Sequence, residues 1–372
     1  MRDDQQQLQP FPKKPNTQKY VQFAGPVDEQ DFCIPLETIS TFQQIREGFS
    51  YGNRPLYLLH GPRQFGKTTI AKGVEKWLTT SRSDVMCLFF EVNELVAADE
   101  TEFWNRLGKL VSKESNCRNY SSFMDLVENC ASNEGKKVCL ILDKMDSLFS
   151  NPDLVTTFLQ VLRMWKAQSG GFFLGFLGVG SYELENIHKI FRGGVISVPF
   201  NVSHSIKVEP FTTSQMTDFF SLIEHRWTFP ASLQEGIMKF SGGAPGVFGS
   251  LIRFTLDEEK WTLELEQWEV WFFELRYYTY LHAYNHTYAR IQQDLHQLND
   301  EEWWLLKRLL GNDEDVTVMD KAAPRLLRMG VVTERPVETG QYGWKTILAI
   351  VSPMMKRVCL DARFQHEKSI KL

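Results

Sequence analysis

One glycine-rich run constrains this chain more than any other feature. It is a complete G-x-x-x-x-G-K-[ST] phosphate-binding loop, with the residues Gly61-Pro62-Arg63-Gln64-Phe65-Gly66-Lys67-Thr68. The apolar run Leu56–Leu59 precedes it and the helical pattern Thr69–Leu78 follows it. A strand–loop–helix unit of this kind directs backbone N–H groups and the positive end of a helix at a phosphate. The sequence therefore predicts nucleotide binding.

Two side chains of this loop have defined roles in that chemistry. Lys67 is expected to reach the β- and γ-phosphates, and the Thr68 hydroxyl to ligate Mg²⁺. The whole segment Gly61–Thr69 is the candidate nucleotide-binding segment. The sequence has no N-K-x-D motif, which specifies guanine, so we expect ATP.

A second motif supports the first. Val138–Leu142 has the pattern of a buried strand and is followed by Asp143. An acid in this place helps to hold Mg²⁺, so Asp143 and Thr68 are the candidate metal ligands. A predicted strand, Val85–Val92, lies between the two motifs. A buried strand that ends in an acid is called a Walker B motif. The order found here is typical of ATPases whose P-loop and Walker B strands are not consecutive in sequence.

The residue after Asp143 is Lys144, where many such ATPases have a glutamate that deprotonates the attacking water. Losing a general base costs about 10²–10⁴ in rate. Asp146 could substitute if the chain turns after the strand, or it could be a helix N-cap or a surface acid. This pattern is consistent with slow ATP hydrolysis and also with the absence of ATP hydrolysis.

Three further residues are candidates for the site. Ser181 follows the predicted strand Phe172–Val179 and could sense the γ-phosphate. Arg192 could act in trans as an arginine finger if the protein assembles, although surface roles compete. Pro245 lies in a Gly-Gly-Ala-Pro-Gly step that opens a predicted helix. Proline is also common at the first position of any helix.

The order of predicted elements indicates an α/β fold, a P-loop NTPase with a parallel sheet. Strands and helices alternate from Leu56 to Glu209, after a lead-in helix expected over Leu36–Arg46. Such alternation places helices on both faces of the sheet. We expect a flexible tail over 1–26, the NTPase core over 27–211, a helical lid over 212–257, an aromatic helical linker over 258–298 and a winged-helix-like domain over 299–372.

The aromatic linker is expected to be one helix from Trp261 to about Leu298. Helical spacing would put five large side chains on one face: Trp268, Trp271, Phe272, Leu275 and Tyr278. We expect this face to be buried between domains, and an exposed face for a partner is the alternative.

The last segment predicts a winged helix. Helices over Glu301–Leu310 and Val318–Met329 precede two short strands. The second helix would contact DNA if the domain bound DNA. Its basic residues have acids nearby, which favours a structural or protein-contact role.

Composition narrows the class of protein. The chain has 372 residues and a net charge of −5, so it has no overall basic field for nucleic acid. Six scattered cysteines without a C-x-x-C pair suit a reducing compartment. The N-terminus has no apolar signal segment, and no apolar stretch is long enough for a bilayer. We expect an intracellular, cytoplasmic protein without a membrane partner, and the sequence leaves a nuclear location open.

Together these marks resemble AAA-like ATPases of the signal-transduction (STAND) group and their archaeal-type relatives. The resemblance rests on the phosphate loop, on Leu140–Phe149 and on Ile206–Thr212, a strand that runs into a Pro-Phe step. Gly243-Ala244-Pro245 is similar to the lid signature of the group, whose proline lies near the nucleotide. The resemblance implies a nucleotide-gated switch, in which ATP favours an assembled state and ADP a closed one. More distantly, the chain resembles the NTPase modules of Crinkler-type effectors, but no nuclease-like acidic cluster follows residue 300.

Three functions are consistent with these observations. The first is an ATP-binding regulatory switch with weak Mg²⁺-dependent hydrolysis, which acts through protein partners or self-assembly. The second is a scaffold that holds nucleotide without hydrolysing it. The third is an initiator-like DNA-binding ATPase, which the acidic balance disfavours.

Overall fold

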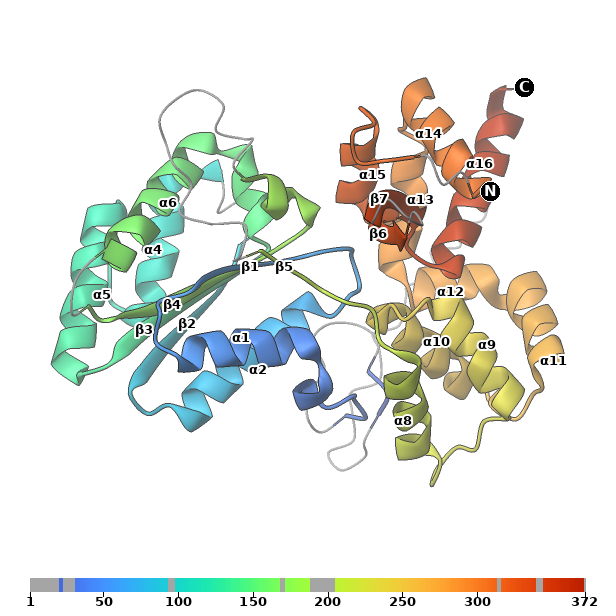
Figure 1. The fold of residues 1–372 in the computed structure, drawn as a ribbon, viewed down its shortest axis with the longest axis horizontal. Helices are drawn as coiled ribbons and strands as arrows, with labels where there is room; N and C mark the ends of the chain where they lie inside the picture. The colour runs from blue at the N-terminus through green and yellow to red at the C-terminus, as the bar shows by residue number, and fades with distance from the viewer. Residues whose placement is uncertain are drawn as a thin grey trace, which may run out of the picture.

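The computed structural model describes residues 20–22, 31–92, 98–167, 171–187, 205–312, 316–338 and 344–370. The chain forms two lobes, one built on a sheet and one mostly helical (Figure 1). No helix in these ranges is both long and apolar enough to cross a membrane.

A parallel sheet forms the centre of the first lobe. Its strands are β1 (Leu56–His60), β2 (Val85–Glu91), β3 (Lys137–Asp143), β4 (Phe173–Val179) and β5 (Ser205–Lys207). They lie in the order β2-β3-β4-β1-β5, and every pair is parallel. The predicted fold class is confirmed. In space β4 separates β1, which leads into the P-loop, from β3, and β2 lies at the edge.

Helices cover both faces of the sheet because its strands are apolar on both sides. Helices α1 (Ser40–Ser50) and α2 (Lys67–Ser81) lie on one face; α4 (Glu100–Val111), α5 (Tyr120–Glu134) and α6 (Pro152–Ala167) lie on the other (Figure 1). Alternate residues of β3 point to the two faces. Cys139 and Ile141 pack with α1 and α2, while Leu140 and Leu142 pack with α4–α6.

The lead-in helix differs from the predicted Leu36–Arg46. Leu36–Thr38 forms a separate 3₁₀ turn, Ile39 is extended, and α1 begins only at Ser40. The break has a tertiary cause, because the Thr38 carbonyl accepts a hydrogen bond (2.9 Å) from Gln215 Nε2 in the other lobe. That carbonyl is therefore engaged outside the helix.

The second lobe begins with three helices in the segment predicted to be the lid: α8 (Thr213–Ile223), α9 (Ala231–Ser241) and α10 (Pro245–Asp257). Gln215 closes a capping box with Thr212 at the start of α8. Proline is the first residue of α10, where its missing N–H costs nothing. The chain therefore enters α8 and α10 with local chemistry that suits the start of a helix.

The aromatic segment is not the single helix that we expected. It consists of α11 (Leu265–Val270), a π-helical turn η5 (Trp271–Arg276), α12 (Tyr277–Ala283) and α13 (His286–Leu295). The wider π turn shifts the helix face that follows it. Trp268 and Phe272 are buried as expected, but Leu275 and Tyr278 are exposed, and Tyr280 is buried in their place.

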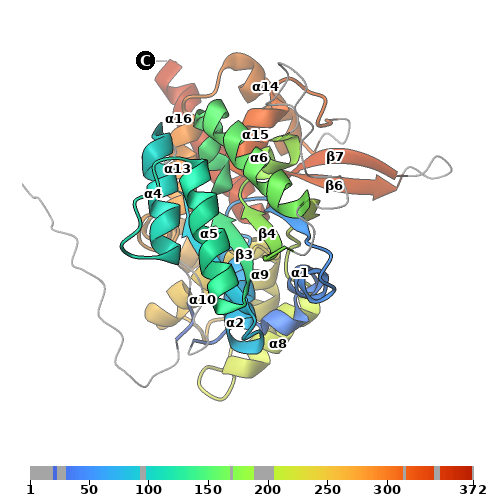
Figure 2. The same cartoon turned by 90° about the vertical axis from the view of Figure 1, so that its left-hand side faces the viewer.

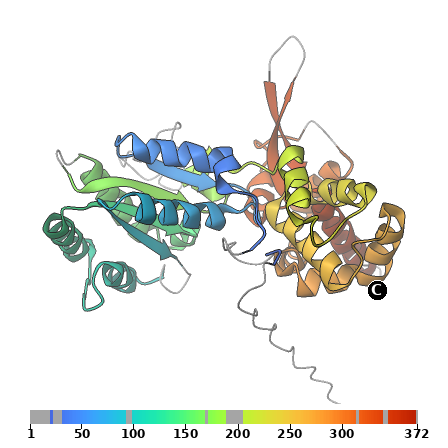
Figure 3. The same ribbon diagram turned by 90° about the horizontal axis from the view of Figure 1, so that it is seen from below.

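The C-terminal unit has the predicted order of helix, helix and hairpin. It comprises α14 (Asp300–Leu310), α15 (Ala323–Met329), an antiparallel hairpin of β6 (Val332–Glu338) and β7 (Trp344–Ile350), and α16 (Pro353–Ile370). The hairpin projects away from the body of the protein (Figures 2 and 3). The second helix starts later than the predicted Val318, because residues 318–322 form turns.

Candidate nucleotide-binding site

The P-loop joins β1 to α2 at the carboxyl edge of the sheet. Gly61, Gln64 and Gly66 have φ angles of 143°, 66° and 73°, so the loop turns tightly before α2 begins at Lys67. A β-carbon on Gly61 would lie 2.5 Å from Val208 Cγ2, which leaves room for glycine alone. The first N–H groups of α2 lack partners within the helix and face the loop.

The structure brings the two predicted magnesium ligands together. Thr68 Oγ1 donates a hydrogen bond to Asp143 Oδ2 (2.9 Å), although 75 positions separate them in sequence. Burial raises the pKa of Asp143, and the hydrogen bonds from Thr68 and from the Lys144 backbone N–H oppose this rise. Magnesium is usually held by one or two carboxylates together with phosphate oxygens and water. A hydroxyl beside a carboxylate fits that donor set.

Lys67 folds back onto its own loop. Its Nζ donates to the carbonyl oxygens of Gly61 (3.0 Å) and Pro62 (2.5 Å). Burial lowers the pKa of Lys67 to about 8, while the charges of Asp146 and Asp143 act in the opposite direction. The amine is therefore a desolvated cation, and the hydrogen-bond partners that it has among the described residues are two backbone carbonyls, which phosphate oxygens can replace.

The loop opens into a cleft of about 2390 Å³. One wall is apolar and comes from two distant segments, the lead-in and the lid: Ile34, Pro35, Leu36, Ile39, Phe211, Phe219 and Phe248. Thr69 and Pro245, both predicted near the nucleotide, also line the cleft. Sequence analysis did not assign the lead-in wall to the site. Its only signal was the apolar character of residues 34–39.

The lid contacts the P-loop directly. Gly246 N–H donates to Gln64 O (2.8 Å), and a β-carbon on Gly246 would lie 2.8 Å from Gln64 Cβ. The Gln64 side chain continues this contact, since its Nε2 donates to Asn285 Oδ1 (2.6 Å). Asn285 is buried, caps α13 and donates to the Tyr280 hydroxyl (2.9 Å). A polar chain therefore runs from the P-loop into the aromatic linker.

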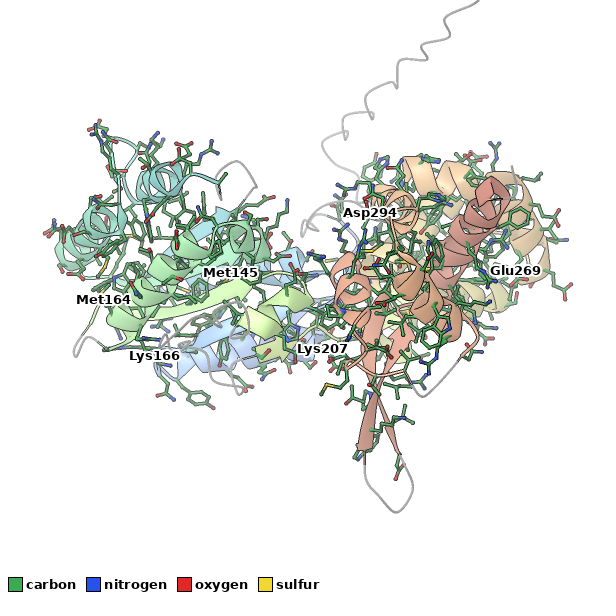
Figure 4. All side chains as sticks on the ribbon, turned by 90° about the horizontal axis from the view of Figure 1, so that it is seen from above. Met145, Met164, Lys166, Lys207, Glu269 and Asp294 are labelled. Atoms are coloured by element: carbon green, nitrogen blue, oxygen red, sulfur yellow. The ribbon has the colours of Figure 1, made fainter. Side chains whose placement is uncertain are left out.

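The C-terminal unit also reaches the site. A β-carbon on Gly330, which ends α15, would lie 3.1 Å from the Arg63 backbone nitrogen. Arg328 of α15 forms an ion pair with Glu183 (3.3 Å), just after β4. Lys207, labelled in Figure 4 at the junction of the lobes, donates to Glu334 O (2.8 Å).

These contacts turn α15 toward the NTPase core. Its other arginine, Arg325, is paired with Glu302 of α14 at 2.7 Å. The helix that would read DNA in a winged-helix DNA binder thus has both of its arginines, Arg325 and Arg328, in ion pairs with other parts of the chain.

The remaining predicted residues lie in different surroundings. Asp146 lies in the 3₁₀ turn η2 (Met145–Ser150), and a β-carbon on Gly180 would lie 2.6 Å from its Oδ1. Ser181 lines the cleft, and its Oγ accepts the Glu183 N–H (3.3 Å) as a cap. Arg192 lies outside the described residues.

Lys144 has a partner that sequence analysis missed. Its backbone adopts the left-handed conformation (φ 56°), and its Nζ donates to Glu91 Oε1. Glu91 is the last residue of β2 and pairs in register with Asp143. The sequence signal for this partner was the position of Glu91, an acid near the carboxyl end of the predicted strand Val85–Val92.

The strand before the P-loop ends in a buried histidine that predicts a pH response. Burial, followed by the charges of Lys207 and Lys67, lowers the pKa of His60 to about 4. In the unfolded chain this histidine has the ordinary pKa of about 6.5. The free energy of unfolding should therefore fall as pH decreases from about 6.5 to about 4, by up to about 3 kcal/mol from this residue.

Urea unfolding of wild type and His60→Gln at pH 7 and pH 5 measures this contribution. The variant should lose less stability between the two pH values than wild type. An identical loss in both proteins would contradict the role of His60.

Fold and site together define a P-loop ATPase of the AAA-like class. The AAA-like domain family matches residues 85–339, which is more than half of the chain. The chain therefore belongs to the AAA-like domain family. The match begins with β2, so the P-loop lies upstream of the matched stretch.

Three solved structures are similar to the chain at low sequence identity. A Walker-type ATPase of Pyrococcus abyssi is 14% identical over 91% of this chain and 99% of its own, with a TM-score of 0.57. ORC2 of Aeropyrum pernix in its ADP form is 13% identical over 93% and 96%, with a TM-score of 0.49. Cdc6p of Pyrobaculum aerophilum is 14% identical over 92% and 99%, with a TM-score of 0.48. Among curated proteins, none matches the chain.

Proposed function

We propose that this chain is an ATP-binding regulatory switch with slow Mg²⁺-dependent hydrolysis. The observation that carries the proposal is the hydrogen bond between Thr68 and Asp143 at 2.9 Å. This contact supports the proposal because it brings a hydroxyl and a carboxylate, two oxygen donors that suit magnesium, together at the phosphate loop. When bound, magnesium would neutralise charge on the phosphates.

The cleft walls support ATP as the nucleotide. Apolar side chains of the lead-in and the lid offer a surface that buries a base, while the P-loop holds the phosphates. The sequence carries no guanine-specifying motif. We therefore assign the base site to the space between Leu36 and Phe248.

The contacts around the P-loop support the switch. Gln64 is bonded both to the lid at Gly246 and to Asn285 of the linker, and Arg63 lies against Gly330. A nucleotide that moves the loop must alter each of these contacts. We propose that bound nucleotide shifts four units relative to one another through these contacts. The units are the core to residue 211, the lid to 257, the linker to 298 and the winged-helix-like unit. Protein partners or self-assembly would read the result.

Asp143→Asn tests the proposal. Without the carboxylate, magnesium loses a ligand, and single-turnover ATP cleavage should fall about 10²-fold or more. The control is Asp125→Asn, an exposed acid on α5 outside the cleft, which should cleave at the wild-type rate. Equal cleavage by Asp143→Asn and wild type would refute the assignment.

A non-hydrolysing scaffold is the second candidate, and Lys144 is the observation that favours it. A cation follows Asp143 where the resemblance implies a glutamate. The same assay separates the two functions: wild type that binds ATP and never cleaves it is a scaffold.

A further inference from the structure

The acid that ends β2 stands beside the magnesium site. Glu91 is directly opposite Asp143 in the pairing of β2 with β3. Its side chain is 55% exposed, and it lines the same cleft as Lys67, Thr68 and Asp143. A solvated carboxylate therefore lies one strand away from the proposed metal ligand.

Glu91 and Lys144 lie at the ends of neighbouring strands and carry opposite charges. The cation follows Asp143 on β3, and the acid lies on the neighbouring strand, where the two side chains form an ion pair. Both side chains are more than half exposed. Exposed ion pairs of this kind contribute little to stability, because water solvates both ions well. Lys144 can therefore leave Glu91 when a more strongly charged partner enters the cleft.

We propose that Glu91 is the general base for ATP hydrolysis, and that Lys144 restrains it until a triphosphate draws the lysine away. This inference rests on the proposed function, because it names the base for that reaction. Several negative charges on the triphosphate compete with one carboxylate for the Lys144 ammonium. Release leaves the Glu91 carboxylate facing the cleft with an open acceptor.

The chemical step is a displacement at phosphorus. A water oxygen forms a bond to the γ-phosphorus, and the bond from that phosphorus to the β,γ-bridging oxygen breaks. Glu91 accepts one proton of the water, the bridging oxygen leaves with ADP, and inorganic phosphate forms. The proton on Glu91 then passes to solvent, so that the base is regenerated.

Two other carboxylates near the site have different surroundings. Asp146 lies against the backbone of Gly180, since a β-carbon on that glycine would lie 2.6 Å from Asp146 Oδ1. Glu183 is engaged by Arg328 of the C-terminal unit. We therefore assign the water to Glu91, whose side chain is more than half exposed.

Glu91→Gln tests the assignment in the full-length chain. Single-turnover cleavage of MgATP should fall by about 10²–10⁴, while the affinity for a fluorescent ATP analogue stays within about threefold of wild type. The nucleotide that copurifies should shift from ADP toward ATP. The matched control is Glu102→Gln, which removes the acid of an exposed ion pair with Arg106 on α4, away from the cleft. It should leave all three measurements at wild-type values.

A second variant separates catalysis from damage to the fold. Adding Lys144→Glu to Glu91→Gln places a carboxylate directly after Asp143 and should restore cleavage at least tenfold over Glu91→Gln alone. A structural role for Glu91 predicts no such rescue, since the native ion pair is absent in both variants.

Several results would overturn the inference. Cleavage by Glu91→Gln at the wild-type rate would do so, as would loss of cleavage in Asp146→Asn together with full activity in Glu91→Gln. Wild type that binds ATP without cleaving it would exclude a catalytic Glu91 and leave nucleotide binding intact. Wild type that fails to bind ATP would instead overturn the proposed function itself.

Discussion

Lys67→Ala is expected to lower the affinity for MgATP about 100-fold or more. The Nζ now donates to two loop carbonyls, and burial lowers the pKa of Lys67 to about 8. Phosphate oxygens would replace these carbonyls and give the ammonium anionic partners in a desolvated place. Charge-assisted hydrogen bonds there are worth about 1.5–3 kcal/mol each, and about 3 kcal/mol corresponds to 100-fold.

The fold should survive this substitution. The lowered pKa means that the folded protein disfavours the charged amine, so its removal relieves a cost of burial. Calorimetric titration with MgATP measures the affinity, and urea unfolding measures the stability. Lys76→Ala, an exposed position on the same helix, is the control and should bind as wild type does. Unchanged ATP binding by Lys67→Ala would remove the P-loop from the site.

Gly243→Ala is expected to destabilise the protein by about 2–4 kcal/mol. Gly243 has a φ of 75°, which costs an alanine about 1 kcal/mol. Its β-carbon would also lie 2.6 Å from the Phe211 carbonyl oxygen, which is backbone and cannot move aside cheaply. That overpacking adds about 1–3 kcal/mol. The two residues are already joined, since Phe211 N–H donates to Gly243 O at 2.8 Å.

Gly135→Ala provides the matched control. Gly135 has a similar φ of 63°, but a β-carbon there would meet nothing within 4 Å. The Gly135→Ala variant should lose only about 1 kcal/mol of unfolding free energy. The difference between the two variants in urea unfolding therefore isolates the contact with Phe211. Equal losses would show that backbone conformation alone fixes Gly243. Because Gly243 lies two residues before Pro245, its variant should also bind MgATP more weakly.

The local part of this architecture could be predicted from sequence. A phosphate loop needs glycines, a lysine and a hydroxyl at fixed spacing, so Gly61–Thr68 can be recognised from the sequence alone. Asp143 is similarly marked by the apolar strand before it. The alternation of strand and helix patterns then gives the parallel sheet, because each pattern reflects the burial of a single element.

Features that arise between elements could not be predicted in this way. The extended Ile39 follows a carbonyl that bonds to another lobe. The exposure of Leu275 depends on a π turn that no local residue requires. The pairing of Glu91 with Lys144 depends on which strands are neighbours, and a one-dimensional pattern does not state that order. The roles of the individual site residues stay predictions until the variants are measured.

The docked position of α15 has a consequence for any nucleic acid. A duplex that needed this helix could bind only molecules in which the contacts of Arg328 and Gly330 with the core had opened. Its apparent affinity would be reduced by the fraction of open molecules. The coupling is reciprocal, so a bound duplex would in turn disfavour the docked position of α15. The contact of α15 with the P-loop and the access of a duplex to α15 would then be competing states of one molecule.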